Sequence, residues 1–340
     1  MKIAGTIVIA ILFILATSCN TTNTSNSKNN KTQQDTVVNT NLNILISPDL
    51  SNRITEKYAK PIDDIEIIKR TLELYYPSIY KSGGRVLNQK DKISLLITNP
   101  QLMNTYNIND ESLKIDISGF NNDERIKYFT DPLHYKTFEN DKNIMINEIT
   151  KVYESAKENT VGADIYDLFK SRLNSDIILE DENPKNSFDH IVINRNRNIL
   201  ILLTDGYIEA GLYGEPENKK QYFYLDNEII RTFRKDFKKS EEINMKLFFE
   251  KNGYGLVPLA NPALNNLEVL AVEFYDRSLS KKSGNNTVLP DDYDILKLFW
   301  DDWMKKSGVK RFKVYERFAT INDFEVALEN FINLKKQKNK

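Results

Sequence analysis

The chain has 340 residues and a nearly balanced charge, with 47 Lys and Arg against 48 Asp and Glu and a formal net charge of −1. This balance gives no electrostatic reason to expect nucleic-acid binding, which depends on clustered basic charge. A single cysteine, Cys19, excludes an intramolecular disulfide, and with only two histidines any metal site would hold a hard cation through oxygen ligands.

The chain begins with the pattern of a secretory signal. Lys2 is followed by an apolar run over residues 3–16 and then by small residues up to Cys19. This arrangement is typical of a signal peptide, and the run is shorter than the about 20 residues of a membrane-spanning helix. Residues 15–19 (LATSC) resemble a bacterial lipobox, which implies a signal peptide over 1–18 and a lipidated Cys19. The alternative is an ordinary signal peptide or anchor with an incidental cysteine.

Residues 20–40 are polar and of low complexity, so they cannot bury enough surface to order themselves. We therefore interpret residues 19–40 as a lipidated cysteine and a flexible tether, and place the folded domain at 41–336. The protein is expected in the cell envelope, anchored to a membrane through the lipid on Cys19 and exposed on the periplasmic or extracytoplasmic side.

Two apolar runs each end in an aspartate. Residues 41–54 read as a buried strand followed by Asp49, and residues 198–207 read as a second strand followed by Asp205. Open α/β sheets bind their ligands outside the carboxyl ends of the strands. The sequence therefore predicts a candidate cation site where these two strands end.

Predicted strands and helices alternate along the remaining chain, which indicates an α/β fold with a doubly wound, mostly parallel central sheet and helices on both faces. Insertions are expected near residues 98–160 and 211–266. Strands are predicted over 92–98, 113–118, 267–276 and 310–316, helices over 63–80, 123–159, 161–173, 227–239, 290–307 and 322–336, a loop over 181–197, and a hairpin around 222–225.

Three short segments resemble the motifs of the von Willebrand factor A (vWA) domain. The Asp-x-Ser-x-Ser motif of that family is similar to residues 49–53 (DLSNR), its threonine loop to residues 162–165 (GADI), and its Asp-Gly motif to residues 204–206 (TDG). The resemblance covers residues 41–336. It implies a vWA-like fold with a metal-ion-dependent adhesion site (MIDAS) at the carboxyl ends of the strands.

The motif is degenerate, because Arg53 and Ala163 stand where the family has hydroxyl ligands. In one interpretation Asp49, Ser51 and Asp205, with Asp164 acting through water, still hold Mg²⁺ or Mn²⁺, which prefer oxygen ligands. In the other, the permanently charged guanidinium of Arg53 folds back onto Asp49 or Asp205 and replaces the cation.

Members of the vWA family mostly mediate protein association, so the resemblance implies a non-enzymatic binding or assembly module with an unknown protein partner. Two alternatives stay open: a metal-dependent hydrolase acting at the Asp49 and Asp205 edge, and a solute-binding lipoprotein that uses residues 211–266 as a lid. The sequence has no nucleophile elbow, P-loop or paired-histidine motif to favour an enzyme.

Overall fold

The computed structural model describes residues 35–333 except 56–59, 86–87, 99–102, 104–107, 159–161, 188–189, 212, 215, 217 and 281. The predicted signal peptide, Cys19 and the first part of the predicted tether lie outside this range. Within it, no helix combines the length and the hydropathy that crossing a membrane requires.

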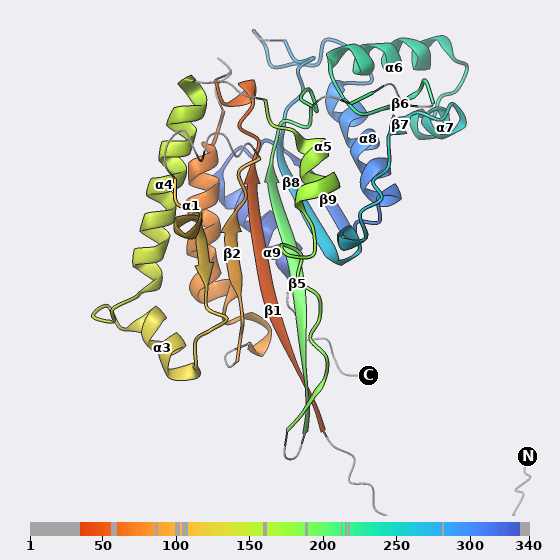
Figure 1. Ribbon diagram of the computed structural model, residues 1–340. Coiled ribbons are helices and arrows are strands. Elements are labelled where there is room, and N and C mark those ends of the chain that lie inside the picture. The colour runs from red at the N-terminus through yellow and green to blue at the C-terminus, as the bar shows by residue number, and fades with distance from the viewer. Residues whose placement is uncertain are drawn as a thin grey trace, which may run out of the picture.

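A mostly parallel sheet forms the centre of the protein (Figure 1). Its main path runs in the order β3-β2-β1-β5-β8-β9, with β3 antiparallel to β2 and the other neighbours parallel. Numbered along the chain, these six strands follow the doubly wound order 3-2-1-4-5-6, whose switch point lies between β1 and β5. The strands are β1 (Asp35–Pro48), β2 (Lys92–Leu95), β3 (Lys114–Asp116), β4 (Lys185–Asn186), β5 (His190–Leu203), β8 (Leu267–Phe274) and β9 (Arg311–Glu316), and a separate parallel pair is formed by β6 (Gln221–Tyr222) and β7 (Gly255–Leu256).

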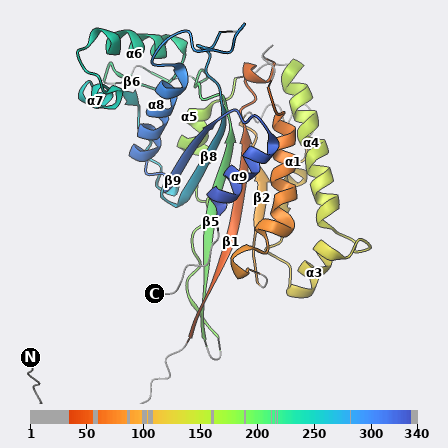
Figure 2. The same cartoon turned by 180° about the vertical axis from the view of Figure 1, so that it is seen from behind.

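Helices cover both faces of the sheet, and each face has its own hydrophobic core. Because side chains alternate along a strand, Ile44 and Ile46 of β1 enter one core and Leu45 enters the other. Figure 2 shows α9 crossing the first face from behind. That face packs against α1 (Asp64–Leu74), α4 (Phe138–Glu158) and α9 (Ile321–Ile332), and the second against α5 (Ile165–Asp167), α6 (Asn227–Lys239), α7 (Met245–Lys251) and α8 (Asp292–Lys306).

The remaining helix, α3 (Asn122–Thr130), precedes α4, so the predicted helical region 123–159 forms two helices. The predicted bounds of α6 are confirmed at both ends, and Trp300 and Trp303 of α8 are fully buried. Short 3₁₀ or π-helical segments complete the fold: η1 (Asn52–Ile54), η2 (Tyr75–Ile79), η3 (Ser82–Gly84), η4 (Asp110–Leu113), η5 (Leu168–Arg172) and η6 (Pro262–Asn266).

Strands β1 and β5 pair over their full length of 14 residues and extend beyond the rest of the sheet as an arm (Figure 1). The loop predicted over 181–197 is therefore wrong, because β4 and the first half of β5 lie there. Residues 35–40, expected to belong to the tether, are likewise part of β1. Facing asparagines explain how so polar a sequence forms a strand: amide Nδ2 donates to amide Oδ1 in the pairs Asn39–Asn194, Asn41–Asn196 and Asn43–Asn198, at 3.1, 3.1 and 2.8 Å.

The hairpin predicted around residues 222–225 is also wrong. Strand β6 pairs in parallel with β7, which lies more than thirty residues further along the chain. Leu225 instead forms an isolated antiparallel bridge with Ile208, just beyond the end of β5. The predicted turn is therefore replaced by two contacts that are distant in sequence.

Candidate functional site

The structure brings Asp49 and Asp205 to one edge of the sheet, at the switch point between β1 and β5. The two strands end side by side, and the backbone N–H of Asp49 donates to the carbonyl oxygen of Leu203 at 2.8 Å. Thr204, the residue between Leu203 and Asp205, donates through its hydroxyl to Asp49 Oδ2 at 2.8 Å. Both aspartates are almost completely buried. Parallel strands that share a carboxyl edge account for this meeting.

The carboxylate of Asp49 is held mainly by hydrogen bonds from neighbouring groups. Besides Thr204, the backbone N–H of Ser51 donates to Asp49 Oδ1 at 3.0 Å. Burial raises the pKa of Asp49, and the nearby Asp205 raises it further, while Arg53 and the bonds from Ser51 and Thr204 oppose this effect. Burial therefore disfavours the charged form of Asp49, and a positive neighbour offsets this effect.

Arg53 is that neighbour, and its side chain is completely buried. Its Nε donates to the carbonyl oxygen of Asp49 at 2.8 Å and lies 3.8 Å from Asp49 Oδ2. Its Nη2 donates to the carbonyl oxygen of Leu203 at 2.7 Å and to Asp64 Oδ2 at 2.6 Å. Of the two aspartates that the sequence suggested as partners, Arg53 contacts Asp49, but its closest carboxylate belongs to Asp64.

Asp64 is the first residue of α1 and had not been singled out from the sequence. Its carboxylate also accepts hydrogen bonds from Lys60 Nζ at 2.9 Å and from the hydroxyl of Tyr153 at 2.9 Å. Burial alone would raise the pKa of Asp64, but Arg53 and Lys60 lower it below the usual value. In turn Asp64 and Asp49 outweigh the effect of burial and raise the pKa of Arg53, so the guanidinium stays charged.

A second arginine, also missed from the sequence, holds Asp205. Nη2 of Arg277 donates to Asp205 Oδ2 at 2.8 Å, and its Nη1 donates to Glu209 at 2.7 Å. The guanidinium lies 3.8 Å from the ring centre of Tyr207 and is partly exposed. The one available signal was its position, because Arg277 follows β8, a third strand that ends at the same edge.

Asp164, the expected water-mediated ligand, caps a short helix. Its Oδ1 accepts the backbone N–H of Asp167 at 2.8 Å and so caps α5, and it also accepts the hydroxyl of Tyr213 at 2.6 Å. No hydrogen bond or ion pair among the described residues joins Asp164 to Asp49 or Asp205. Its place as a water-mediated metal ligand stays a prediction.

Each of the three buried aspartates at this edge has a cationic partner. Asp49, Asp64 and Asp205 face three cations, namely Arg53, Lys60 and Arg277. Within the described part of the chain, no three or more His, Cys, Asp or Glu side chains are grouped so that they could hold a metal ion. Arg53 and Arg277 thus contact the two aspartates of the predicted site directly, and binding of Mg²⁺ or Mn²⁺ stays a prediction.

Glu273, near the end of β8, is a buried acid that the sequence did not reveal. Its backbone φ is +74°, a conformation that costs energy for a residue with a side chain. Neither carboxylate oxygen accepts a hydrogen bond from a described residue. Burial raises the pKa of Glu273 to about 7 and Asp64 adds to this, while Lys60, Arg53 and Arg317 lower it.

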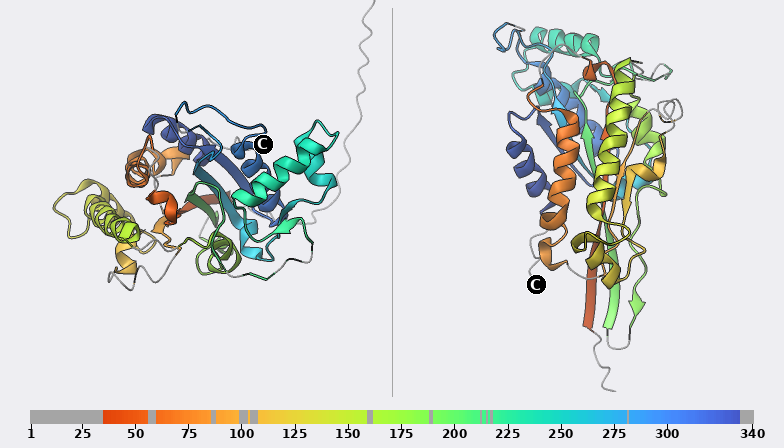
Figure 3. Two further views of the ribbon diagram at one scale, coloured as in Figure 1. Left: turned by 90° about the horizontal axis from the view of Figure 1, so that it is seen from above. Right: turned by 90° about the vertical axis from the view of Figure 1, so that its left-hand side faces the viewer.

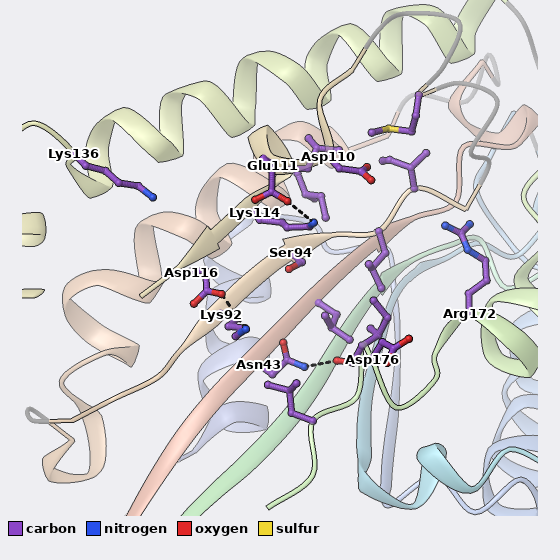
Figure 4. A pocket seen from close by; sticks show the side chains of 18 residues that line it. Asn43, Lys92, Ser94, Asp110, Glu111, Lys114, Asp116, Lys136, Arg172 and Asp176 are labelled. Atoms are coloured by element: carbon purple, nitrogen blue, oxygen red, sulfur yellow. Dashed lines mark hydrogen bonds and ion pairs between the residues drawn. The ribbon is translucent and has the colours of Figure 1, made fainter. Parts of the chain in front are cut away.

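A separate cavity of about 710 Å³ lies over the face of β1, β2 and β3 (Figure 4). Ion pairs of 2.9 Å join Lys92 to Asp116 and Lys114 to Glu111 along its wall. Ser94 lies between these pairs on β2, as the close view shows. The lining is polar and carries both signs of charge, so the cavity suits a polar solute better than an apolar one.

No protein-family model matches the chain, and no curated protein matches it. Among solved structures, proximal thread matrix protein 1 from the mussel byssus is similar over 88% of this chain and 49% of its own, with 10% sequence identity and a TM-score of 0.30. The chain thus spans about half the length of that protein. A likeness this distant carries no argument about fold or function.

Proposed function

We propose that this protein is a lipid-anchored module of the cell envelope that binds or assembles other proteins through the carboxyl edge of a vWA-like domain. The doubly wound strand order and the position of Asp49 and Asp205 at the switch point support the vWA-like assignment. Cys19 and the residues before it support the lipid anchor through their resemblance to a lipobox.

The observation that carries the proposal is the pairing of both motif aspartates with arginines. The buried Arg53 donates to the backbone carbonyl oxygens of Asp49 and Leu203, where β1 and β5 end. The partly exposed Arg277 pairs with the carboxylate of Asp205. An ion-paired edge of this kind needs no metal to be stable. It presents polar groups such as Glu209 and Arg277 to a partner, which suits binding better than metal-assisted hydrolysis.

Titration calorimetry with Mg²⁺ and Mn²⁺ tests the central point. We expect no saturable binding to the wild-type chain, because Arg53 already occupies the position of the cation. Arg53→Ser restores the serine of the family motif and should create a site with a dissociation constant in the millimolar range or tighter, of order −4 kcal/mol. The double variant that adds Asp49→Ala should lose it. Binding to the wild type that Asp49→Ala abolishes would restore the metal-dependent interpretation.

The binding role itself is tested by crosslinking. A photoreactive residue at Asn52, which is exposed beside Ser51, should capture a specific envelope protein with or without chelator. The matched control places the photoreactive residue at Val326, which is exposed on α9. It should not capture the protein that is captured from Asn52. Phosphatase or esterase turnover that disappears in Asp205→Ala would instead favour an enzyme.

Solute binding is the second candidate, because the cavity at Ser94 has the volume of a small-ligand site, for which about 300–1,000 Å³ is typical. The residues 211–266, expected to act as a lid, do not line this cavity. A solute-binding role would therefore use the face of β1 to β3 rather than the segment suggested from the sequence.

A further inference from the structure

Helix α6 has two faces of opposite character. Ile230, Phe233 and Arg234 are buried against the second face of the sheet. Arg231, Lys235, Lys238 and Lys239 are exposed. At 3.6 residues per turn these four cations fall within an arc of about 100°.

This basic face is not neutralised by the protein itself. None of its four cations forms an ion pair with another residue of the described part of the chain, although 22 ion pairs hold side chains elsewhere. Two acids belong to the same helix: Asp236 is turned to the hydroxyl of Tyr254 at 2.7 Å, and Glu228 lies in the first turn, before the four cations. Four like charges on one helix face repel one another, and an anionic partner relieves that repulsion.

The basic face lies at the same end of the molecule as the candidate site. Figure 1 shows α6 above α8, at the end of the molecule where β5 and β8 have their carboxyl ends, and the view from above in Figure 3 shows α6 to one side of these strands. A buried network joins the two. Arg234 of α6 pairs with Asp292 at the start of α8, and Asp292 accepts the hydroxyl of Tyr207 at 2.6 Å. The ring of Tyr207 lies under Arg277, the partner of Asp205.

We propose that the basic face of α6, defined as Arg231, Lys235, Lys238 and Lys239, docks an acidic segment of a partner protein beside the Asp49 and Asp205 edge. The proposal rests on the proposed binding function and adds the chemical class of the partner. Ile243 and Leu247, exposed at 95% and 44% where α6 leads into α7, supply apolar contacts next to the charges. A mixture of acidic and apolar residues in the partner fits this surface.

Geometry favours a protein over the membrane of the anchor. The described chain begins at the tip of the arm, and α6 lies at the opposite end (Figure 1). Strand β1 alone, with 14 residues, is roughly 45 Å long. The tether expected between Cys19 and Asp35 would span only about 20 Å on average. A membrane that holds Cys19 would therefore face the tip of the arm and not the basic face of α6.

The test uses the full chain in detergent and a fluorescent peptide of alternating Glu and Leu as the probe. Replacing the four cations of the basic face by Gln should weaken peptide binding at least tenfold, and raising NaCl from 50 to 500 mM should weaken wild-type binding similarly. The matched control replaces four exposed, ion-paired lysines by Gln, namely Lys69, Lys151, Lys185 and Lys306, and removes the same net charge. It should change affinity less than twofold.

Equal weakening in both variants would mean that only net charge matters, and the proposal would fail. It would also fail if phosphatidylglycerol vesicles bound more tightly than the peptide and the α6 variant alone lost that binding. Thermal unfolding of each variant checks that the fold is kept. Crosslinking from Asn52 reports on the proposed function separately, so loss of one result with the other intact shows which of the two is wrong.

Discussion

The guanidinium of Arg53 lies where the ends of β1 and β5 meet the first turn of α1. It bonds to two backbone carbonyl oxygens and to Asp64, and each of these contacts is buried. A permanently charged group with several donors can satisfy all of them at once, which a hydrated cation such as Mg²⁺ does only with a matching set of oxygen ligands. At the residue scale, Arg53 therefore satisfies the buried acceptors at these strand ends without a metal ion.

Glu273 gives the clearest prediction at this scale. Its folded pKa of about 7 lies above the usual value of 4.5, so the folded state binds the proton more tightly than the unfolded state. Its contribution to stability is complete below pH 4.5 and is lost as pH rises to 7 and above. The loss amounts to about 3 kcal/mol. Glu273→Gln should remove this pH dependence of the free energy of unfolding, so the variant should become more stable than the wild type as pH rises.

Urea unfolding at pH 5 and pH 8 measures the effect. The matched control is Glu268→Gln on the same strand, because Arg197 lowers the pKa of Glu268 despite its burial. The control should lose stability at pH 8, where the charged form of Glu268 is the stabilising one. A Glu273→Gln variant with the same pH dependence as the wild type would show that Glu273 is not the proton-binding group.

At the element scale, the arm formed by β1 and β5 depends on paired asparagines. The pair nearest the sheet centre is buried, and Asn198 there also bonds to the backbone of Leu179 and Asn266. In the pair nearest the tip, Asn39 is partly exposed and Asn194 is buried. The burial of the asparagine pairs therefore decreases along β1, from the sheet centre to the tip of the arm.

This gradient predicts unequal costs for the same substitution. Asn198→Ala should lower the free energy of unfolding by about 2–4 kcal/mol, because it leaves several buried groups unpaired. Asn39→Ala, where water can replace the lost bond, should cost only about 0.5–1 kcal/mol. Denaturant unfolding compares the two. Similar losses would mean that the ladder contributes equally along the arm.

At the scale of the whole molecule, the arm fixes where the candidate site faces. Strand β1 leads from Asp35 at the tip directly to Asp49 at the opposite edge. A chain anchored through Cys19 would therefore hold its strand ends, together with α6, away from its own membrane. That orientation suits a module that meets partners across the envelope.

The anchor can be checked directly. Cys19→Ala should abolish incorporation of labelled palmitate and move the protein from the membrane fraction to the soluble fraction, because it removes the thiol that would carry the lipid. Ser18→Ala keeps a small residue before the cysteine and should leave palmitate incorporation and membrane association unchanged. Cys19→Ala protein that still sediments with membranes would contradict the lipoprotein assignment.

The sequence by itself determined the elements whose signal is local. Apolar runs placed the inner parts of β1 and β5, helical spacing and end signals placed α6 and α8, and the shared carboxyl edge of parallel strands brought Asp49 towards Asp205. Each of these features depends on residues within one segment, or on a general rule of sheet architecture.

Only the tertiary structure decided the rest. The polar half of β5 forms a strand because its asparagines face those of β1, some 155 residues earlier in the chain. Asp64, Arg277 and Glu273 belong to the site because the order of the strands and helices carries them to it. Apart from the position of Arg277 after a strand, such partners have no local sequence signal, since electrostatic pairing depends on distance in space and not on distance along the chain.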